Sequence, residues 1–132
     1  TTYSSPVQVG ALTTWLQVAT GIYNNTYAVK TDGTLWSWVN NNHGQLGIGT
    51  TGNRSDPQQV GALTTWLQVA GGSYHAVAVK TDGTLWAWGQ NDYGQLGLGD
   101  TASRSSPVQV GALTTWLNIA GGYHFTIATK QA

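Results

Sequence analysis

The sequence is poor in charge and lacks several residue types altogether. Only 8% of its 132 residues are charged, against about 25% in a typical soluble domain, and Cys, Met and Glu are absent. Without Cys it forms no disulfide and no thiolate metal site. Five Lys and Arg balance five Asp, and the cations are dispersed. The sequence therefore offers no basic patch of the kind that non-specific nucleic-acid binding requires, and we expect no nucleic-acid partner.

Membrane and targeting signals are also missing. No stretch approaches the roughly 18 apolar residues of a membrane-spanning helix, so we expect no membrane insertion. Residues 1–5 lack the basic and apolar regions of a signal peptide. The compartment is therefore not fixed by the sequence, although low charge and absent Cys suit an extracellular, cell-surface or virion location.

What the sequence does contain is a long internal repeat. The segment 10–16, Gly-Ala-Leu-Thr-Thr-Trp-Leu, recurs unchanged at 61–67 and again at 111–117. A second segment, Lys-Thr-Asp-Gly-Thr-Leu-Trp, stands at 30–36 and 80–86. We divide the chain into one repeat array with units at about 6–56, 57–106 and 107–132, the last of them partial.

Each unit reads as short strands separated by turns. In the second copy, 66–70 reads as a short strand that runs into Gly71-Gly72, and 75–80 consists almost entirely of small or β-branched residues. Residues 85–88 alternate large and small, and 107–110 begins with a proline that suits an edge strand. Asp82-Gly83 predicts a two-residue hairpin turn, and the Asn and Gly of the loops 40–44 and 91–94 suit left-handed turn positions. Four strands every 50 residues predict an all-β fold of β-propeller blades, each a four-stranded antiparallel sheet.

Specific motifs of the unit carry a family resemblance. Residues 86–99, Trp-Ala-Trp-Gly-Gln-Asn-x-x-Gly-Gln-Leu-Gly-x-Gly, are followed by Arg104-x-x-Pro107-Val108-x-Val110. Together with Ala70-Gly-Gly-x-x-His75, they resemble the repeat of the regulator of chromosome condensation family. The resemblance implies a propeller of four-stranded blades, and near-identical copies are typical of its microbial and phage members. It does not imply one function, because the family includes an exchange factor, a photoreceptor and an enzyme inhibitor.

The sequence offers no catalytic or cofactor site. The five Asp stand in turn-like segments, and no Glu or Cys is present to complete a nucleophile–base or carboxylate pair. The three His, at 43, 75 and 124, occupy different places in the unit, so they predict no ring of metal ligands. We expect a protein that is not an enzyme and has no metal or cofactor.

The aromatic residues divide into two groups. We interpret the seven Trp as structural core, with the paired Trp of each Trp-x-Trp motif packed between adjacent blades; they are Trp15, Trp36, Trp38, Trp66, Trp86, Trp88 and Trp116. Loop positions at which the copies disagree are the candidate partner-binding residues; they are Tyr23, Asn24, His43, Tyr93 and Tyr123.

The repeat count shapes the functional hypothesis. About 2.6 units are fewer than the four to eight blades of a propeller, so we expect an incomplete ring with an outer strand at Pro6 and a partial last blade. The sequence leaves open whether the chain is a segment of a longer repeat protein or a protomer that assembles with copies of itself. We expect a non-catalytic structural or protein-interaction module of a larger or oligomeric surface, phage or extracellular assembly. The alternative is a dedicated protein-binding propeller, exchange-factor-like or inhibitor-like, that uses its divergent loops.

Overall fold

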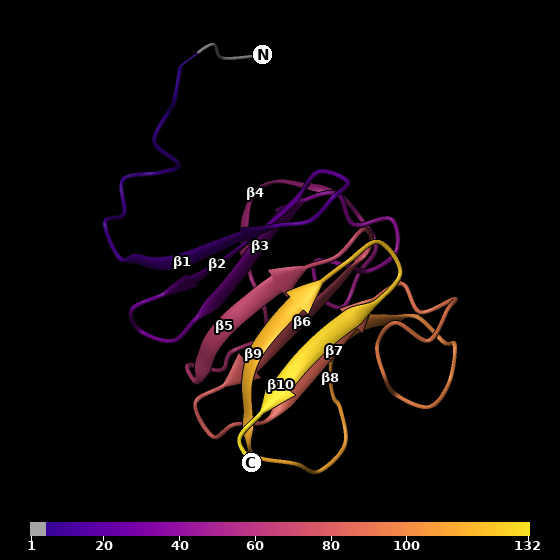
Figure 1. The fold of residues 1–132 in the computed structure, drawn as a ribbon. Helices are drawn as coiled ribbons and strands as arrows, with labels where there is room; N and C mark the ends of the chain where they lie inside the picture. The colour runs from indigo at the N-terminus through magenta and orange to yellow at the C-terminus, as the bar shows by residue number, and fades with distance from the viewer. Residues whose placement is uncertain (1–4) are drawn as a thin grey trace.

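The computed structural model describes residues 5–132, which form ten β-strands in three antiparallel sheets (Figure 1). The strands are β1 (Trp15–Thr20), β2 (Asn25–Lys30), β3 (Leu35–Val39), β4 (Arg54–Gln59), β5 (Trp66–Gly71), β6 (His75–Lys80), β7 (Leu85–Gly89), β8 (Arg104–Gln109), β9 (Trp116–Gly121) and β10 (Thr126–Lys130). Blade 1 is the sheet β1-β2-β3-β4, blade 2 is β5-β6-β7-β8, and the half-blade is β9-β10.

The three sheets stack face to face as an arc of a β-propeller, which confirms the all-β propeller prediction (Figure 1). The first strands of the sheets, β1, β5 and β9, are neighbours along the inner side of the arc. Each of blades 1 and 2 is a meander in which consecutive strands pair; the first two connections of each blade are short, and the third is a long loop. Residues 5–132 thus form two complete blades and two strands of a third, an incomplete ring.

The outer strands show why the predicted strand at Pro6 is wrong. Pro57 and Pro107 lie in β4 and β8, at the sheet edges, where a missing amide donor is tolerated. Both strands begin earlier than the sequence suggested, because Arg54 and Arg104 already pair with the end of the preceding strand. The equivalent segment at Pro6 forms no strand, since an outer strand needs the third strand of its own sheet and none precedes it among the described residues.

The hairpins between second and third strands contain one residue more than predicted. In blade 1 the amide of Gly33 donates to the carbonyl of Lys30 over 3.0 Å, and Gly33 alone takes a positive φ, +80°. The turn is therefore Lys30-Thr-Asp-Gly33, and Asp32 occupies an ordinary right-handed position. The Oδ1 atom of Asp32 accepts hydrogen bonds from the amide and hydroxyl of Thr34, at 2.9 and 2.6 Å. These bonds hold the pKa of Asp32 below its ordinary value of 3.8, and the same bonds from Thr84 lower the pKa of Asp82.

The hydrophobic core lies between the blades rather than within them. Between blades 1 and 2, Tyr27, Val29 and Leu35 pack against Trp66, Val69, Ala76, Ala78 and Trp88. Between blade 2 and the half-blade, Val77, Val79 and Leu85 pack against Trp116, Ile119 and Ala128. Alternate residues of β6 therefore face opposite neighbours, which explains why the whole strand is buried.

Two glycines allow the inner strands to approach one another closely. A Cβ atom on Gly71 would lie 2.8 Å from the carbonyl oxygen of Thr20, and one on Gly121 would lie 2.6 Å from that of Gly71. Contacts this short with backbone atoms cannot be relieved by a rotamer change, so any side chain at either position would push the sheets apart. The equivalent residue of β1 is Thr20, which is exposed.

The seven Trp occupy three kinds of position. Trp66 and Trp88 are buried between blades 1 and 2, whereas Trp38 lies on the outer side of blade 1 with no blade against it. The expectation that every Trp-x-Trp pair packs between adjacent blades is therefore wrong for Trp38, because the face that buries Trp88 in blade 2 is a free face in blade 1. Trp15, Trp36, Trp86 and Trp116 are half-buried. A lysine amine lies over the ring of Trp36 and another over that of Trp86. Nζ of Lys30 is 3.9 Å from the centre of Trp36, and Nζ of Lys80 is 3.6 Å from that of Trp86.

Candidate partner-binding surface

One end of the propeller arc gathers the divergent loops. In an antiparallel meander the first and third connections of each sheet leave at the same end, so the loops 21–24, 40–53, 72–74, 90–103 and 122–125 share one side of the molecule. Candidate residues separated by up to 100 positions in the sequence therefore become neighbours. The hairpins of the Asp-Gly turns lie at the opposite end.

Six aromatic side chains form a continuous row across this end. Tyr23 stacks on Tyr74 with ring centres 4.8 Å apart and planes 10° apart, and its hydroxyl lies 2.6 Å from that of Tyr123. The remaining contacts, all between 4.3 and 5.7 Å, extend the chain in both directions. We call this the aromatic row, in the spatial order His43, Tyr74, Tyr23, Tyr123, His124 and Tyr93.

The row draws on all three sheets and remains open to solvent at one end. Tyr93 is 68% exposed and Tyr123 is 45% exposed, whereas Tyr23, His43, Tyr74 and His124 are half-buried. The row itself contains no charged side chain. The hydrogen bond from Tyr23 raises the pKa of Tyr123. The row contains no Lys, Arg, Asp or Glu, and its hydroxyl and imidazole groups can donate and accept hydrogen bonds.

Two buried asparagines hold the longer loops in place. The Nδ2 atom of Asn41 donates to the carbonyls of Thr50 and Gly52, at 2.8 and 3.0 Å, and its Oδ1 atom accepts from the amide of Leu46. Asn91 makes the equivalent bonds in blade 2. Neither residue has a positive φ, so the left-handed role predicted for these asparagines is wrong. Their side chains instead fasten loops of more than ten residues, which fixes His43 and Tyr93 relative to the blades.

The structure brings together four of the five residues predicted from the sequence. Tyr23, His43, Tyr93 and Tyr123 belong to the aromatic row, and Asn24 lies beside it, exposed, with a positive φ of +55°. Asn24 also borders a separate groove of about 350 Å³ with Val39 and Arg54. Val39 is the second non-glycine residue with a positive φ, +88°, at the position that Gly89 occupies in blade 2.

The residues predicted from the sequence did not include Tyr74 and His124, which also belong to this surface. Both stand in the same connection, between first and second strands, that carries Tyr23 and Tyr123. The signal was present in the sequence, because Tyr74 and His124 occupy the repeat position of Asn24, at which all the copies disagree. The third histidine, His75, lies elsewhere: it is fully buried, its Nε2 atom is 3.1 Å from Thr126 Oγ1, and burial lowers its pKa to about 4.

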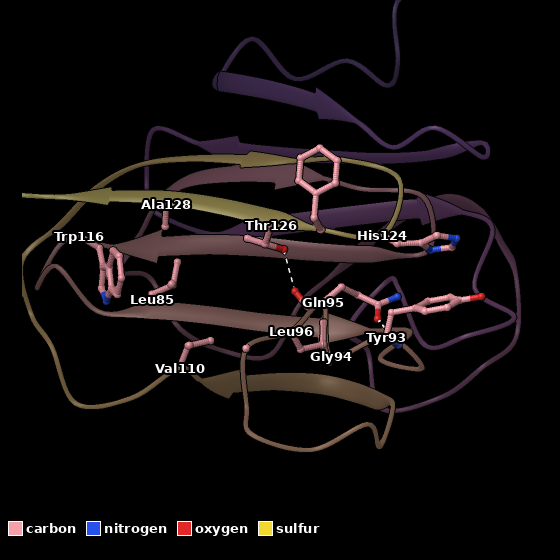
Figure 2. A pocket seen from close by; sticks show the side chains of 12 residues that line it. Leu85, Tyr93, Gly94, Gln95, Leu96, Val110, Trp116, His124, Thr126 and Ala128 are labelled. Carbon is pink, nitrogen blue, oxygen red and sulfur yellow. Dashed lines mark hydrogen bonds between the residues drawn. The ribbon is translucent and has the colours of Figure 1, made fainter.

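A groove runs from the row into the gap between blade 2 and the half-blade (Figure 2). Its volume is about 410 Å³. Tyr93 and His124 lie at one end of it and Trp116, Leu85 and Val110 at the other, with the hydrogen bond from Thr126 Oγ1 to the Gln95 carbonyl, 2.9 Å, between them. Among residues 5–132, no three His or Asp side chains come close enough together to hold a metal ion, and no helix is long and apolar enough to cross a bilayer.

Comparison with known proteins identifies the repeat. The family model described as the regulator of chromosome condensation (RCC1) repeat matches residues 32–79 and 82–129, and a second model of the same description matches 66–95. The chain belongs to the RCC1 repeat family. Each matched segment begins at an Asp-Gly turn; together they span β3 to β10, apart from the last residue of β6 and of β10. No protein of curated function matches the RCC1-repeat chain in sequence.

Several solved structures share the fold. Prp20p from Saccharomyces cerevisiae, reported with its binding properties to Gsp1p and histones, superposes with a TM-score of 0.82 at 20% identity over 96% of this chain and 33% of its own. Human WBSCR16 gives 0.79 at 24% identity, over 88% and 30%. Yeast RCC1 (Prp20) bound to Kap60 gives 0.77 at 21% identity, over 91% and 31%. The chain thus spans about a third of the length of these structures.

Proposed function

We propose that this chain is a non-catalytic protein-interaction module, and that the aromatic row is its recognition surface. The observation that carries the proposal is the row itself: six aromatic side chains from three sheets, in contact with one another and partly open to solvent. Tyr is enriched at protein interfaces because it supplies a large rigid apolar area together with a hydrogen-bonding group. Scaffolded loops are also where propellers and other repeat folds recognise partners.

The electrostatics of the surface favour a partner held by packing rather than by charge. The chain has a formal net charge of zero, and the row contains no Lys, Arg, Asp or Glu. Association should therefore depend little on ionic strength, unlike binding through a charged patch. Among the solved relatives, Prp20p is reported to bind Gsp1p and histones, and yeast RCC1 is reported bound to Kap60. These likenesses support a protein as the class of partner here.

A non-enzymatic role fits what the carboxylates do. Asp32 and Asp82 are bound to the backbone and hydroxyl groups of their own hairpins, and Asp100 is paired with Arg104 at 2.8 Å. Each is therefore engaged in shaping a loop. None of them lies in the aromatic row or lines the groove beside it.

A capture experiment with matched variants tests the proposal. Immobilised chain carrying Tyr93→Ala or Tyr123→Ala is compared with Leu63→Ala and Leu113→Ala, because Leu63 and Leu113 are each 46% exposed at the opposite end of the arc. We expect a stoichiometric partner of the wild-type chain to be retained by the Leu variants and weakened at least about tenfold by the Tyr variants. Equal retention by all four variants would show that the row is not the recognition surface.

Membership of a larger assembly is supported by a second surface. The free face of blade 1 has an apolar groove of about 430 Å³ lined by Trp15, Val18 and Trp38 among others. An uncovered apolar face of this kind marks a contact surface. Light scattering should show a mass above that of one chain if copies associate there, and Trp38→Lys should restore the single-chain mass. A single-chain mass for the wild type at high concentration would exclude assembly through this face.

A further inference from the structure

The chain lacks the two sulfur-containing side chains that oxidants ordinarily modify. Cys and Met are both absent, so there is no thiol or thioether to oxidise and no disulfide to link distant parts of the fold. Phenols and indoles are the oxidisable side chains that remain. All seven indoles are buried or half-buried, whereas the aromatic row holds three phenols, Tyr74, Tyr23 and Tyr123, that are joined through contacts of Tyr23.

Tyr23 and Tyr123 meet at the corners of their rings that carry the hydroxyls. Their oxygens are 2.6 Å apart, their ring centres are 5.7 Å apart and their planes are inclined at 76°. An ortho carbon is the neighbour of the carbon that bears the hydroxyl, so this contact also brings an ortho carbon of each ring toward the other. A dityrosine bond joins two such carbons, lies in the plane of both rings and leaves the rings twisted about it with their hydroxyls side by side. The pair is therefore close to the arrangement of the coupled product.

The other tyrosines of the row are arranged differently. Tyr74 lies face to face with Tyr23, with ring centres 4.8 Å apart and planes 10° apart. A bond in the plane of both rings cannot form between parallel faces unless one ring turns edge-on and breaks the stack. Tyr93 is 68% exposed, but its ring contacts the imidazole of His124 and no phenol among residues 5–132. Tyr23 and Tyr123 are therefore the pair arranged for coupling.

Two complete connections make this contact. Tyr23 stands between β1 and β2 and Tyr123 between β9 and β10, and both flanking strands of each connection are present. Tyr23 comes from blade 1 and Tyr123 from the half-blade, so the contact bridges blade 2, which lies between them. Tyr123 is 45% exposed, so an oxidant in solution can reach the pair. A covalent bond here would hold three successive sheets together.

We propose that Tyr23 and Tyr123 form an oxidative cross-linking site, at which a peroxide activated by a haem peroxidase joins the two rings as dityrosine. Each phenol gives one electron to the oxidant and one proton to solvent, which leaves two phenoxyl radicals. An ortho carbon of one ring bonds to an ortho carbon of the other, and the hydrogen on each of these carbons moves as a proton to the phenolic oxygen. The peroxide takes up the two electrons and two protons and becomes two molecules of water. The chain thereby loses two hydrogen atoms.

The cross-link does the work of a disulfide in a chain that has no Cys. It joins residues 100 positions apart, and closing so long a loop stabilises the fold by lowering the entropy of the unfolded chain. We expect the cross-linked chain to melt at least about 5 °C above the unmodified chain. The cross-link forms without a partner, so it goes beyond the proposed function and does not rest on it.

Peroxidase and hydrogen peroxide added to the full chain at low concentration, where links between chains are rare, test the proposal. We expect a single-chain product that is lighter by two hydrogen atoms and has the fluorescence of dityrosine. Trypsin cleaves after Lys and Arg, and it leaves Tyr23, Tyr74 and Tyr123 on the separate peptides 1–30, 55–80 and 105–130. The expected cross-link joins the first of these peptides to the third.

Tyr-to-Phe variants provide matched controls, because they keep each ring and remove only the hydroxyl from which the radical forms. Tyr23→Phe and Tyr123→Phe should lower the yield of this cross-link at least about tenfold, since the favourably oriented pair is lost. Tyr74→Phe and Tyr93→Phe should leave the yield unchanged. The loss in Tyr23→Phe also excludes the two other tyrosines on the peptide 1–30.

Four results would overturn the proposal. They are a main cross-link to the peptide 55–80, equal yields from Tyr123→Phe and the wild type, no single-chain product where free tyrosine is coupled, and no rise in melting temperature of the cross-linked chain. An equal yield from the chain unfolded in urea, where free tyrosine is still coupled, would overturn it as well. Proximity of the two rings in the fold would then not be the cause of the cross-link.

Discussion

Trp88 and Trp38 stand at the same position of two nearly identical repeats, yet only Trp88 has a blade packed against it. Replacing each by Ala therefore separates what a blade contributes from what its neighbour contributes. A fully buried indole removes about 150–250 Å² from water, which at about 25 cal/mol per Å² corresponds to about 4–6 kcal/mol. Buried Trp→Ala substitutions cost about 3–5 kcal/mol in practice, and the lost hydrogen bond from Trp88 Nε1 to the Gln45 carbonyl adds about 1 kcal/mol.

We expect Trp88→Ala to lower the free energy of unfolding by about 4–5 kcal/mol and Trp38→Ala by only about 1–2 kcal/mol, because Trp38 is half-exposed. Urea unfolding at matched protein concentration gives both values, and Trp88→Phe serves as a control that keeps a ring but loses the indole donor. A domain stability of about 5–15 kcal/mol would leave Trp88→Ala partly unfolded. Equal costs for the two Ala variants would refute the reasoning, since stability would then arise within each sheet and not between sheets.

Three further outcomes follow from charge and backbone geometry. The hydrogen bonds from Thr84 lower the pKa of Asp82 from 3.8. The ionised carboxylate therefore stabilises the fold above pH 4, and this stabilisation is lost as the pH falls through the lowered pKa. Melting curves between pH 5 and 2 should accordingly show a flatter decline in melting temperature for Asp82→Asn than for the wild type. His75 has its pKa lowered to about 4 by burial, so protonation favours the unfolded chain, and stability should fall by roughly 2–4 kcal/mol between pH 6.5 and 4. His75→Asn, which installs the residue found at this position in the first copy, should abolish that fall, and a pH-independent wild-type midpoint would contradict it. Val39→Gly should raise the free energy of unfolding by about 1 kcal/mol, because it removes the backbone strain of a β-branched residue at a φ of +88°. Calorimetry measures the change, and a lower melting temperature would show that the Val side chain stabilises the fold by more than the strain costs.

The strands could be predicted from the sequence because the same turn residues and alternating patterns recur at the same place in each repeat. The predicted strand 75–80 coincides with β6, and the strands predicted at 66–70 and 85–88 end one residue before β5 and β7. The fourth strand was predicted at 107–110, but β8 begins at Arg104. Its first residues, Arg-Ser-Ser, have little strand propensity and extend only because β7 offers them an edge to pair with.

The aromatic row could be predicted only in part. Disagreement among copies identified Tyr23 and Tyr93 as unusual, but their arrangement depends on the stacking of the sheets. Tyr23 and Tyr123 share a hydrogen bond although 100 residues separate them. The roles of Asn41 and Asn91 were equally hidden, since each fastens carbonyls nine and eleven residues further along the chain. Local propensity describes a residue and its near neighbours, whereas the aromatic row and the asparagine hydrogen bonds both join residues far apart in the sequence.

The glycines of the inner strands also make the two sides of the array different. Gly71 and Gly121 allow each sheet to approach the one before it, but the corresponding residue of the first sheet is Thr20. Another unit stacked on that side with the same spacing would bring the Thr20 side chain within about 3 Å of its backbone, a distance that Cβ atoms do not reach. A sheet stacked on that side must therefore stand further from blade 1 than blade 2 does. The two sides of the arc accept different sheet spacings, and a single threonine sets the difference.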